Sequence, residues 1–426
     1  MNRTMRALPA LLLLGSLAAG GCHLDLQDPN RPTEEEVFGT TDGIQAVAIG
    51  LQAAYAEELR DPVWVVGLLT DEMGAGLNAF QSYIELDAGR DITPGYYNTA
   101  PFDPWTGHYE VVKLANDLLR VVPDAPGLGA GTRSGLLALA RLYRAMALGN
   151  LIQLYEQIPT EVGPDQSPSF RNRAEVLAEV LRLLEEARAQ LQTTAPSAAF
   201  NQQVLAPGLD LANTIHAMTA RYALIAGDYN LALQAAGRVN PGVLSTFQFS
   251  ATDPNPLWDL WYNSGNAYQM RPEQTFRTQA EAGDRRVAYW VRPDTIRGGN
   301  ARLDDLNQYR NRPDAIPVYL PDEIRLIQAE AYARTGQLAQ ARTLVNAVRT
   351  QCTSTLAEPL ACLPALTEAQ LPTQAAVLAE ILKQRRYELF LTGLAYEDRR
   401  RFGQTLKYRW LPVPQAECDR NPNAPC

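Results

Sequence analysis

Residues that commonly carry catalysis are scarce in this sequence. Among 426 residues only three are histidines, namely His23, His108 and His216. His216 lies between Ile215 and Ala217, a setting in which a hydrogen-bonded core histidine is the usual outcome. The sequence contains no Gly-x-Ser-x-Gly elbow, no His-Glu-x-x-His zinc motif and no phosphate-binding glycine loop. We therefore expect no catalytic residue, no cofactor and no metal ligand set, and we do not expect an enzyme.

Positive charge and long apolar runs are also scarce. The formal net charge is −9, and removing residues 1–21, which hold two arginines and no acid, would leave −11. Such an acidic chain is poorly suited to neutralising phosphates, so nucleic acid is not an expected partner. Beyond the N-terminus no stretch approaches the roughly 20 apolar residues of a membrane-spanning helix. No Gly/Ser linker or charged run divides the chain, which predicts one domain over residues 33–426.

The N-terminus has the pattern of a secretory signal. A short basic start precedes the apolar run Leu8–Leu17, and the small residues Ala19–Gly21 lead to Cys22. This order predicts a signal peptide over residues 1–21, lipid attachment to the Cys22 thiol, and a lipidated tether over residues 22–32. The acyl chains would anchor the protein to a membrane that it does not span. An ordinary cleaved signal with an incidental cysteine is the alternative.

The remaining four cysteines fall into two close pairs. Cys352 and Cys362 are ten residues apart, and Cys418 and Cys426 are eight apart. An even number of cysteines in an exported chain predicts two disulfides. Three pairings are possible, and we favour the two local ones. No histidine lies near these cysteines, so a zinc site is the weaker interpretation.

The stretch Pro321–Arg349 has the pattern of two helices joined by a tight turn. Apolar residues recur at spacings of three and four on both sides of Gly336, which can adopt the left-handed conformation that ends a helix. A second set of residues repeats the first at the same offsets. The two sets are Ala329, Gly336, Leu338, Ala341, Val348 and Ala220, Gly227, Tyr229, Ala232, Val239. They predict a mostly α fold, a tetratricopeptide-like helical-hairpin solenoid, although two unrelated amphipathic hairpins would give the same pattern.

Residues 240–319 differ in kind, because they are rich in Pro, Gly, Asn, Asp and aromatic residues and show little helical periodicity. We interpret them as a loop-rich insertion, which at this length is normally functional or holds short strands. Sugars stack on exposed aromatic rings while polar side chains hold their hydroxyl groups. The candidate ligand-binding residues are Trp258, Trp261, Tyr262, Asn266 and Tyr268, with Tyr96 and Tyr97 in a second irregular loop. The alternative is that these aromatic side chains belong to the core.

Residues 320–403 are predicted to form C-terminal repeat helices, with a helix from Gln374 to about Leu394. Four charged residues near this end are interpreted as a structural ion-pair network: Arg385, Arg386, Glu388 and Asp398. Glycoside hydrolysis would need two carboxylates that face one groove. Nothing in the sequence points to such a pair, but any two acids can meet in space, so a hidden glycosidase remains a third hypothesis.

Several short motifs occur in a fixed order along the chain. The most specific is Gln384–Leu389, followed by Gly393 and Asp398–Arg400. Further segments are Asp322–Ala331, Leu411–Pro414, Asn421–Asn423, and Trp105 and Tyr109 with Ala115 and Asn116. Together they resemble the SusD/RagB family of outer-membrane nutrient-binding lipoproteins. Gln384 and Arg399 depart from the family's Glu-Arg-Arg-x-Glu-Leu…Gly…Asp-Leu-Arg-Arg pattern.

The resemblance implies a largely helical protein that is lipid-anchored to the outer membrane and faces the cell exterior. It also implies a partner, a SusC-like TonB-dependent barrel, to which the protein delivers a captured nutrient, often an oligosaccharide. Such proteins bind and do not catalyse. The runner-up hypothesis is a repeat scaffold that holds an envelope protein complex and binds no ligand, with all its aromatic residues buried.

Overall fold

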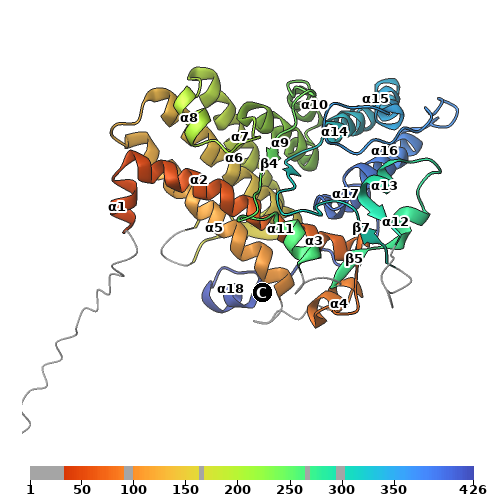
Figure 1. Ribbon diagram of the computed structural model, residues 1–426, viewed down its shortest axis with the longest axis horizontal. Coiled ribbons are helices and arrows are strands. Elements are labelled where there is room, and N and C mark those ends of the chain that lie inside the picture. The colour runs from red at the N-terminus through yellow and green to blue at the C-terminus, as the bar shows by residue number, and fades with distance from the viewer. Residues whose placement is uncertain (1–32, 91–98, 163–166, 264–268, 294–302) are drawn as a thin grey trace, which may run out of the picture.

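The computed structural model describes residues 33–90, 99–162, 167–263, 269–293 and 303–426. Several predictions fall outside these ranges: the signal peptide, the lipidated tether with Cys22, and the candidate ligand residues Tyr96, Tyr97, Asn266 and Tyr268. The described part is built mainly from helices, with a few short antiparallel two-stranded ribbons between them (Figure 1). The predicted mostly α fold is confirmed.

The N-terminal half packs around one long buried helix. Its main helices are α1 (Glu34–Phe38), α2 (Thr41–Glu58), α3 (Arg60–Leu69), α5 (Thr99–Val121), α6 (Ala130–Leu154) and α7 (Arg173–Thr193). Helix α6 contacts α2, α5 and α7, so nearly every side of it is covered. Helix α7 begins at Asn172, whose side chain accepts from the Glu175 N–H while the Glu175 carboxylate accepts from the Asn172 N–H. This reciprocal cap fixes where the chain turns back along α6.

The two predicted hairpins form and lie next to each other. The first joins α9 (Leu211–Ala226) to α10 (Tyr229–Ala236), and the second joins α14 (Pro321–Arg334) to α15 (Leu338–Thr350). Gly227 and Gly336 both adopt φ +81°, the left-handed conformation expected at each turn. Helix α10 packs on α14, so the two hairpins bury their apolar stripes against one another (Figure 1). Helix α16 (Gln374–Glu388) then packs on α14 and α15; it ends at Glu388, earlier than the predicted Leu394.

The insertion contains short strands that the sequence pattern did not place. Strand β4 (Thr246–Phe247) pairs with β8 (Ile316–Pro317), and β6 (Val291–Arg292) pairs with β7 (Asp305–Leu306). Strand β5 (Met270–Pro272) pairs with β1 (Met73–Ala75) from the N-terminal third, with Met73 opposite Pro272. The insertion also holds the short helices α11 (Pro256–Tyr262), α12 (Gln274–Thr278) and α13 (Arg286–Trp290). The ribbon of β1 and β5 fastens the insertion to the N-terminal third, and the other two ribbons join parts of the insertion to each other.

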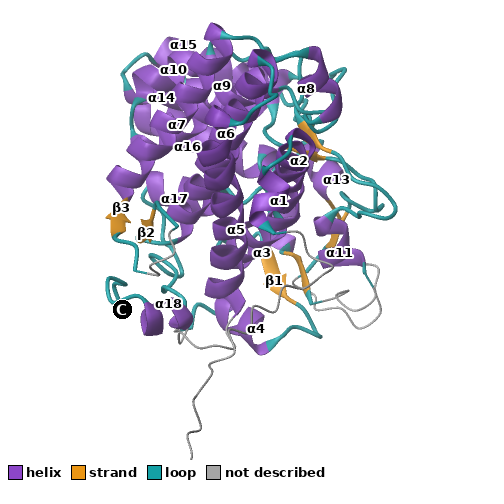
Figure 2. Cartoon of the chain, turned by 90° about the vertical axis from the view of Figure 1, so that its left-hand side faces the viewer, coloured by secondary structure: helices purple, strands orange, loops and turns teal. Residues whose placement is uncertain are grey.

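The smaller elements cover the ends of this framework. They are α4 (Gln81–Asp87), η1 (Val122–Asp124), α8 (Ala198–Gln203), α17 (Ala395–Arg401), α18 (Gln415–Arg420), and the ribbon of β2 (Gln157–Pro159) with β3 (Phe170–Asn172). Figure 2 shows α4 at the foot of the long helix α5, and α18 close to the C-terminus. Both predicted local disulfides form, Cys352–Cys362 and Cys418–Cys426.

The predicted ion-pair network is present at three of its four residues. Arg385 donates to Asp398 over 2.8 Å, and Glu388 lies 3.5 Å from the guanidinium of Arg286 in the insertion. Arg386 differs, because it donates to the Gln279 side chain over 2.8 Å and has no carboxylate at ion-pair distance within the described chain. The network therefore fixes the last helices to the insertion, as a structural role requires.

Candidate functional site

The predicted aromatic cluster centres on the short helix α11. Asn255 caps this helix, because its side chain accepts from the N–H groups of Leu257 (2.7 Å) and Trp258 (3.0 Å). Pro256 occupies the first helical turn, where its missing N–H costs nothing. The cap therefore sets the direction in which Trp258 and Trp261 leave the helix.

The two tryptophans of α11 have different environments. Trp261 is only 6% exposed, and its ring stacks on Tyr309 with centroids 6.3 Å apart. Trp258 is half-buried, and the guanidinium carbon of the exposed Arg312 lies 4.8 Å from its ring centroid. Trp258 therefore remains partly exposed, with a guanidinium over one face of its ring, whereas Trp261 is a packing residue in this conformation.

Tyr262 ties the cluster to the ribbon of β6 and β7. Its hydroxyl donates to the carbonyl of Leu306 over 2.8 Å and lies 3.2 Å from that of Gln308. Burial raises the pKa of this phenol, which keeps it neutral and able to donate. The Tyr262 hydroxyl thus holds α11 in place, and its ring is half-buried.

Several exposed apolar side chains that sequence reasoning missed lie in the N-terminal third of the chain. Four of the large apolar side chains that remain exposed come from one N-terminal region: Leu77 (71%), Phe80 (57%), Ile84 (38%) and Phe102 (40%). Helix α4 carries Ile84 and packs on β1, the partner of β5 in the insertion. The ribbon of β1 and β5 thus joins the region of α4 to the segment that carries α11 (Figure 1). The predicted Tyr96 and Tyr97 follow α4 in sequence. The sequence contains little signal for these exposed residues, because Leu77, Phe80 and Ile84 are separated by mostly polar residues.

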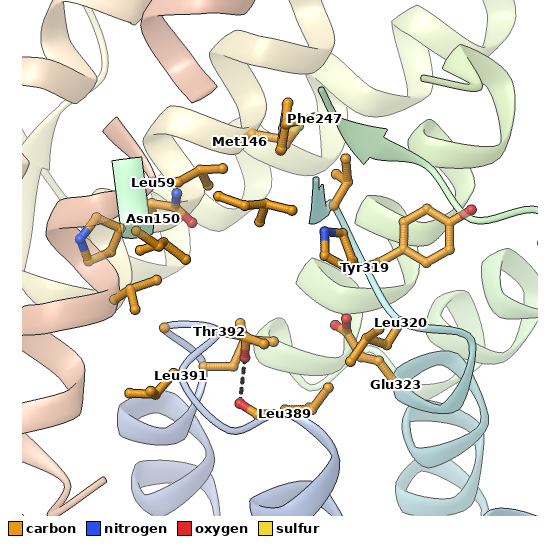
Figure 3. A pocket seen from close by; sticks show the side chains of 18 of the residues that line it. Leu59, Met146, Asn150, Phe247, Tyr319, Leu320, Glu323, Leu389, Leu391 and Thr392 are labelled. Atoms are coloured by element: carbon orange, nitrogen blue, oxygen red, sulfur yellow. Dashed lines mark hydrogen bonds between the residues drawn. The ribbon is translucent and has the colours of Figure 1, made fainter. Parts of the chain in front are cut away.

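An enclosed cavity lies deeper, where α2, α6, β8, α14 and residues 389–394 meet (Figure 3). Its volume is about 70 Å³, enough for a few water molecules and too small for a sugar, since ligand pockets typically measure roughly 300–1,000 Å³. Its polar groups are paired: Arg221 donates to Glu323 over 2.6 and 2.7 Å, and Asn150 donates to the Tyr55 hydroxyl over 3.0 Å. Burial raises the pKa of Tyr55 to about 12, so it stays neutral. This cavity is part of the scaffold.

The histidines of the described chain offer no acid–base pair. His108 is 1% exposed, and its ring nitrogens lie 2.8 Å from the Pro104 carbonyl and 3.0 Å from the Asn150 amide. Burial lowers the pKa of His108 to about 4, so the ring is neutral at physiological pH. His216 is half-buried, and burial lowers its pKa as well. Within the described residues no group of three or more His, Cys, Asp or Glu side chains is arranged to hold a metal ion.

Comparison with known proteins finds a family match in the C-terminal part of the chain. Residues 307–421, which include α14 to α18, match the SusD family. Residues 307–421 belong to the SusD family. This confirms the resemblance to the SusD/RagB family inferred from the C-terminal motifs, which lie largely in this region. A search of curated proteins finds no match.

The SusD fold extends well beyond the matched segment. A SusD superfamily protein from Bacteroides thetaiotaomicron has a TM-score of 0.72 at 17% identity, over 90% of this chain and 99% of that chain. A SusD superfamily protein from Bacteroides fragilis has a TM-score of 0.68 at 18% identity, over 92% and 100%. A SusD-like carbohydrate binding protein from Bacteroides vulgatus has a TM-score of 0.63 at 19% identity, over 86% and 84%. These likenesses establish the fold.

One helix of the described chain, α6, is long and apolar enough to cross a membrane by composition alone. However, 89% of its most apolar window is buried inside the protein, against α2, α5 and α7. Its hydrophobicity is therefore explained by its place at the centre of the helical core.

Proposed function

We propose that this protein captures a nutrient oligosaccharide at the cell surface and delivers it to a SusC-like TonB-dependent barrel. The observation that carries the proposal is the SusD-family match over residues 307–421 on a SusD fold, together with a similar structure described as a carbohydrate binding protein. The protein would bind the oligosaccharide without making or breaking a covalent bond in it. The half-exposed Trp258 beside Arg312 supplies the stacking surface and the hydrogen-bond donor that sugar recognition needs.

Surface attachment is part of the same proposal. Lipid on Cys22 and the tether of residues 22–32 would hold the helical domain at the outer membrane, facing the exterior. Replacing Cys22 by serine removes the thiol that carries the lipid. We expect C22S to move from the membrane fraction to the soluble fraction while the folded domain keeps its ligand affinity. Retention of C22S in the membrane would contradict lipid anchoring through this residue.

Binding is tested with the soluble form that starts at Leu24, on a glycan array, beside W258A. A matched control is available in Trp410, which is also half-buried and has an arginine over its ring, Arg400 at 3.9 Å. We expect W258A to lose at least tenfold in affinity for the bound glycan class and W410A to bind as the parent does. Equal loss in both variants, or in neither, would remove Trp258 from the site.

The two other hypotheses predict different results in the same assay. A scaffold that binds no ligand would give no signal with any glycan or peptide. A glycosidase would shorten the bound glycan, which mass spectrometry of the recovered ligand detects. We expect binding with the glycan recovered intact.

A further inference from the structure

A second concave region lies away from α11, between Thr70–Glu72, the start of α12, and helices α16 and α17. It is an open groove of about 820 Å³, a size suited to a ligand of one or a few sugar units. Strand β5 leads from the α11 segment to Glu273 at one wall, and α16 supplies Arg385, Arg386 and Tyr387 at the other. Lining residues come from α12, α16 and α17, which lie on the same side of the molecule in Figure 1.

Three deeply buried side chains of this groove have a polar atom without a hydrogen-bond partner. They are Glu72 (Oε1), Arg385 (Nη1) and Tyr387 (the hydroxyl), and their residues are 5%, 3% and 1% exposed. Buried polar groups are nearly always paired in native proteins, so three unpaired atoms among the residues that line the groove indicate a missing partner. Arg385 Nη1 is a donor, and the tyrosine hydroxyl can donate. The missing partner is therefore an acceptor.

Glu72 is itself held in the form that donates. Burial raises the pKa of Glu72 to about 8, so the carboxyl is largely protonated at neutral pH. The charged groups around it are Arg399 and Asp398 on α17, Arg386 on α16, Asp71 beside it in sequence, and Glu273 at the end of β5. Its other oxygen accepts only a long bond, 3.4 Å, from the Leu391 N–H. Asp71 (φ +57°) and Leu391 (φ +54°), next to Glu72 in sequence and in space, both adopt a left-handed backbone that is costly for a non-glycine residue.

One cation of the groove has no acidic partner within the described chain, although the chain as a whole is acidic. Four cationic side chains line the groove (Lys383, Arg385, Arg386 and Arg399) against Asp71, Glu72, Glu273 and Asp398, and Glu281 beside Lys383 adds a fifth acid. Lys383 is neutralised by Glu281 at 2.6 Å and Arg385 by Asp398 at 2.8 Å. Arg386 has only the neutral Gln279 as a hydrogen-bond partner in the described chain, so its guanidinium can take a bidentate anion.

We propose that this groove binds the anionic group of an acidic saccharide, a uronate carboxylate or a sulfate ester, with Arg386 as its principal contact. The sugar part of this assignment rests on the proposed nutrient-binding function. Neutral polar side chains line the rest of the groove, as sugar hydroxyls require: Thr275, Gln279, Gln404 and Thr405. We assign the unpaired atoms of Arg385 and Tyr387 as further donors to the anion, and protonated Glu72 as a third donor.

The first test titrates the soluble form with glucuronate, glucose 6-sulfate and glucose, and follows binding by protein NMR. We expect the two anions to bind at least tenfold more tightly than glucose. R386Q removes the charge of Arg386, and we expect it to abolish this preference, while R386K retains part of it. R182Q is the control, since Arg182 lies on the exposed face of α7, and it should leave the preference unchanged. Equal binding of glucose and the anions, or full preference in R386Q, would overturn the proposal.

The second test uses pH. Below about pH 8 Glu72 donates to the anion, and above it the carboxylate repels the anion, so affinity should fall as the pH rises through 8. E72Q keeps a donor of the same size without a titrating proton, so it should bind the anions with no such fall between pH 7 and 9. The same fall in E72Q as in the parent would overturn the role given to Glu72.

A third arm separates this proposal from the proposed function. W258A should keep the anion preference of the groove even where it loses the glycan of the array, because the two sites share no side chain. Acetyl-trialanine, a carboxylate without a sugar, should bind at least tenfold more weakly than glucuronate. If the peptide binds as tightly as glucuronate, the groove is an anion site and its assignment to a saccharide is wrong. If the groove discriminates as expected and W258A changes no glycan affinity, the groove stands and the α11 site fails.

Discussion

The helical hairpins and the insertion of this protein are encoded in different ways. In α14 and α15 the spacing of apolar residues, the turn glycine and the helix ends all lie within one continuous segment, Pro321–Thr350. In the insertion, by contrast, β5 is paired with β1, about two hundred residues earlier in sequence, and Arg286 faces Glu388 of α16. The scaffold is thus specified locally, whereas the insertion is specified by its partners. A change in the insertion should therefore destabilise the whole domain wherever it cuts such a long-range tie.

The strongest such tie is Arg286. Its side chain is fully buried and pairs with Asp284 over 2.7 Å, with Gln384 over 2.7 Å and with Glu388 over 3.5 Å. R286A would leave two buried carboxyl groups without their charged partner, and we expect it to lower the free energy of unfolding by about 3–5 kcal/mol. Urea denaturation measures this change. R182A, which removes exposed ion pairs on α7, should cost less than about 1 kcal/mol, and an equal loss in the two variants would contradict the tie.

The two tryptophans of α11 allow a buried ring and a partly exposed ring of the same helix to be compared for their contribution to stability. W261A removes a ring that is 6% exposed and stacks on Tyr309, so we expect a loss of about 3 kcal/mol in the free energy of unfolding. W258A removes a half-buried ring and should cost about 1 kcal/mol. Thermal and urea denaturation of both variants check this order. A larger loss in W258A would make Trp258 the packing residue and would weaken its role in the site.

The sequence predicted the scaffold better than the site for a physical reason. Helical periodicity and the glycines at 227 and 336 located both hairpins, because a helix–turn–helix unit is determined by its own residues. The two-residue strands of the insertion could not be placed, because a short strand is defined by a partner that sequence spacing does not reveal. For the same reason Trp258 and Trp261 looked equivalent, since a spacing of three says that they are near each other but not which ring Tyr309 covers. The groove of Glu72 and Arg386 was missed because its walls come from three separate parts of the chain.

The loop after α15 is closed by a disulfide, whereas the neighbouring hairpins have no covalent link of this kind. Cys352–Cys362 closes a short segment after α15, with a sequence separation of 10. We expect C352A/C362A to lower the free energy of unfolding by roughly 2–3 kcal/mol, since the unfolded chain gains freedom. Denaturation with and without a reductant provides the measurement. In the double variant the reductant should cause no loss of stability that comes from the Cys352–Cys362 bond. A stability equal to that of the parent would show that neighbouring contacts alone hold the segment.

The turn glycines test the local encoding of the scaffold. An added Cβ at Gly227 or Gly336 would meet no atom within 4 Å, so only the φ of +81° opposes a side chain there. G227A and G336A should each cost about 1 kcal/mol. The matched control is Gly50 inside α2, which also has free space around it, and G50A should stabilise the protein by up to about 1 kcal/mol. Changes of the same sign at all three positions, measured by denaturation, would contradict the local account.

The central claim is that the helical hairpins are scaffold and that the insertion binds the nutrient. Hydrogen–deuterium exchange of the soluble form, with and without a glycan found on the array, compares the two regions in one measurement. We expect the bound glycan to protect peptides that cover α11, Pro256–Tyr262, and to leave α15, Leu338–Thr350, unchanged. Protection confined to the α14–α15 hairpin, with no change at α11, would contradict the account.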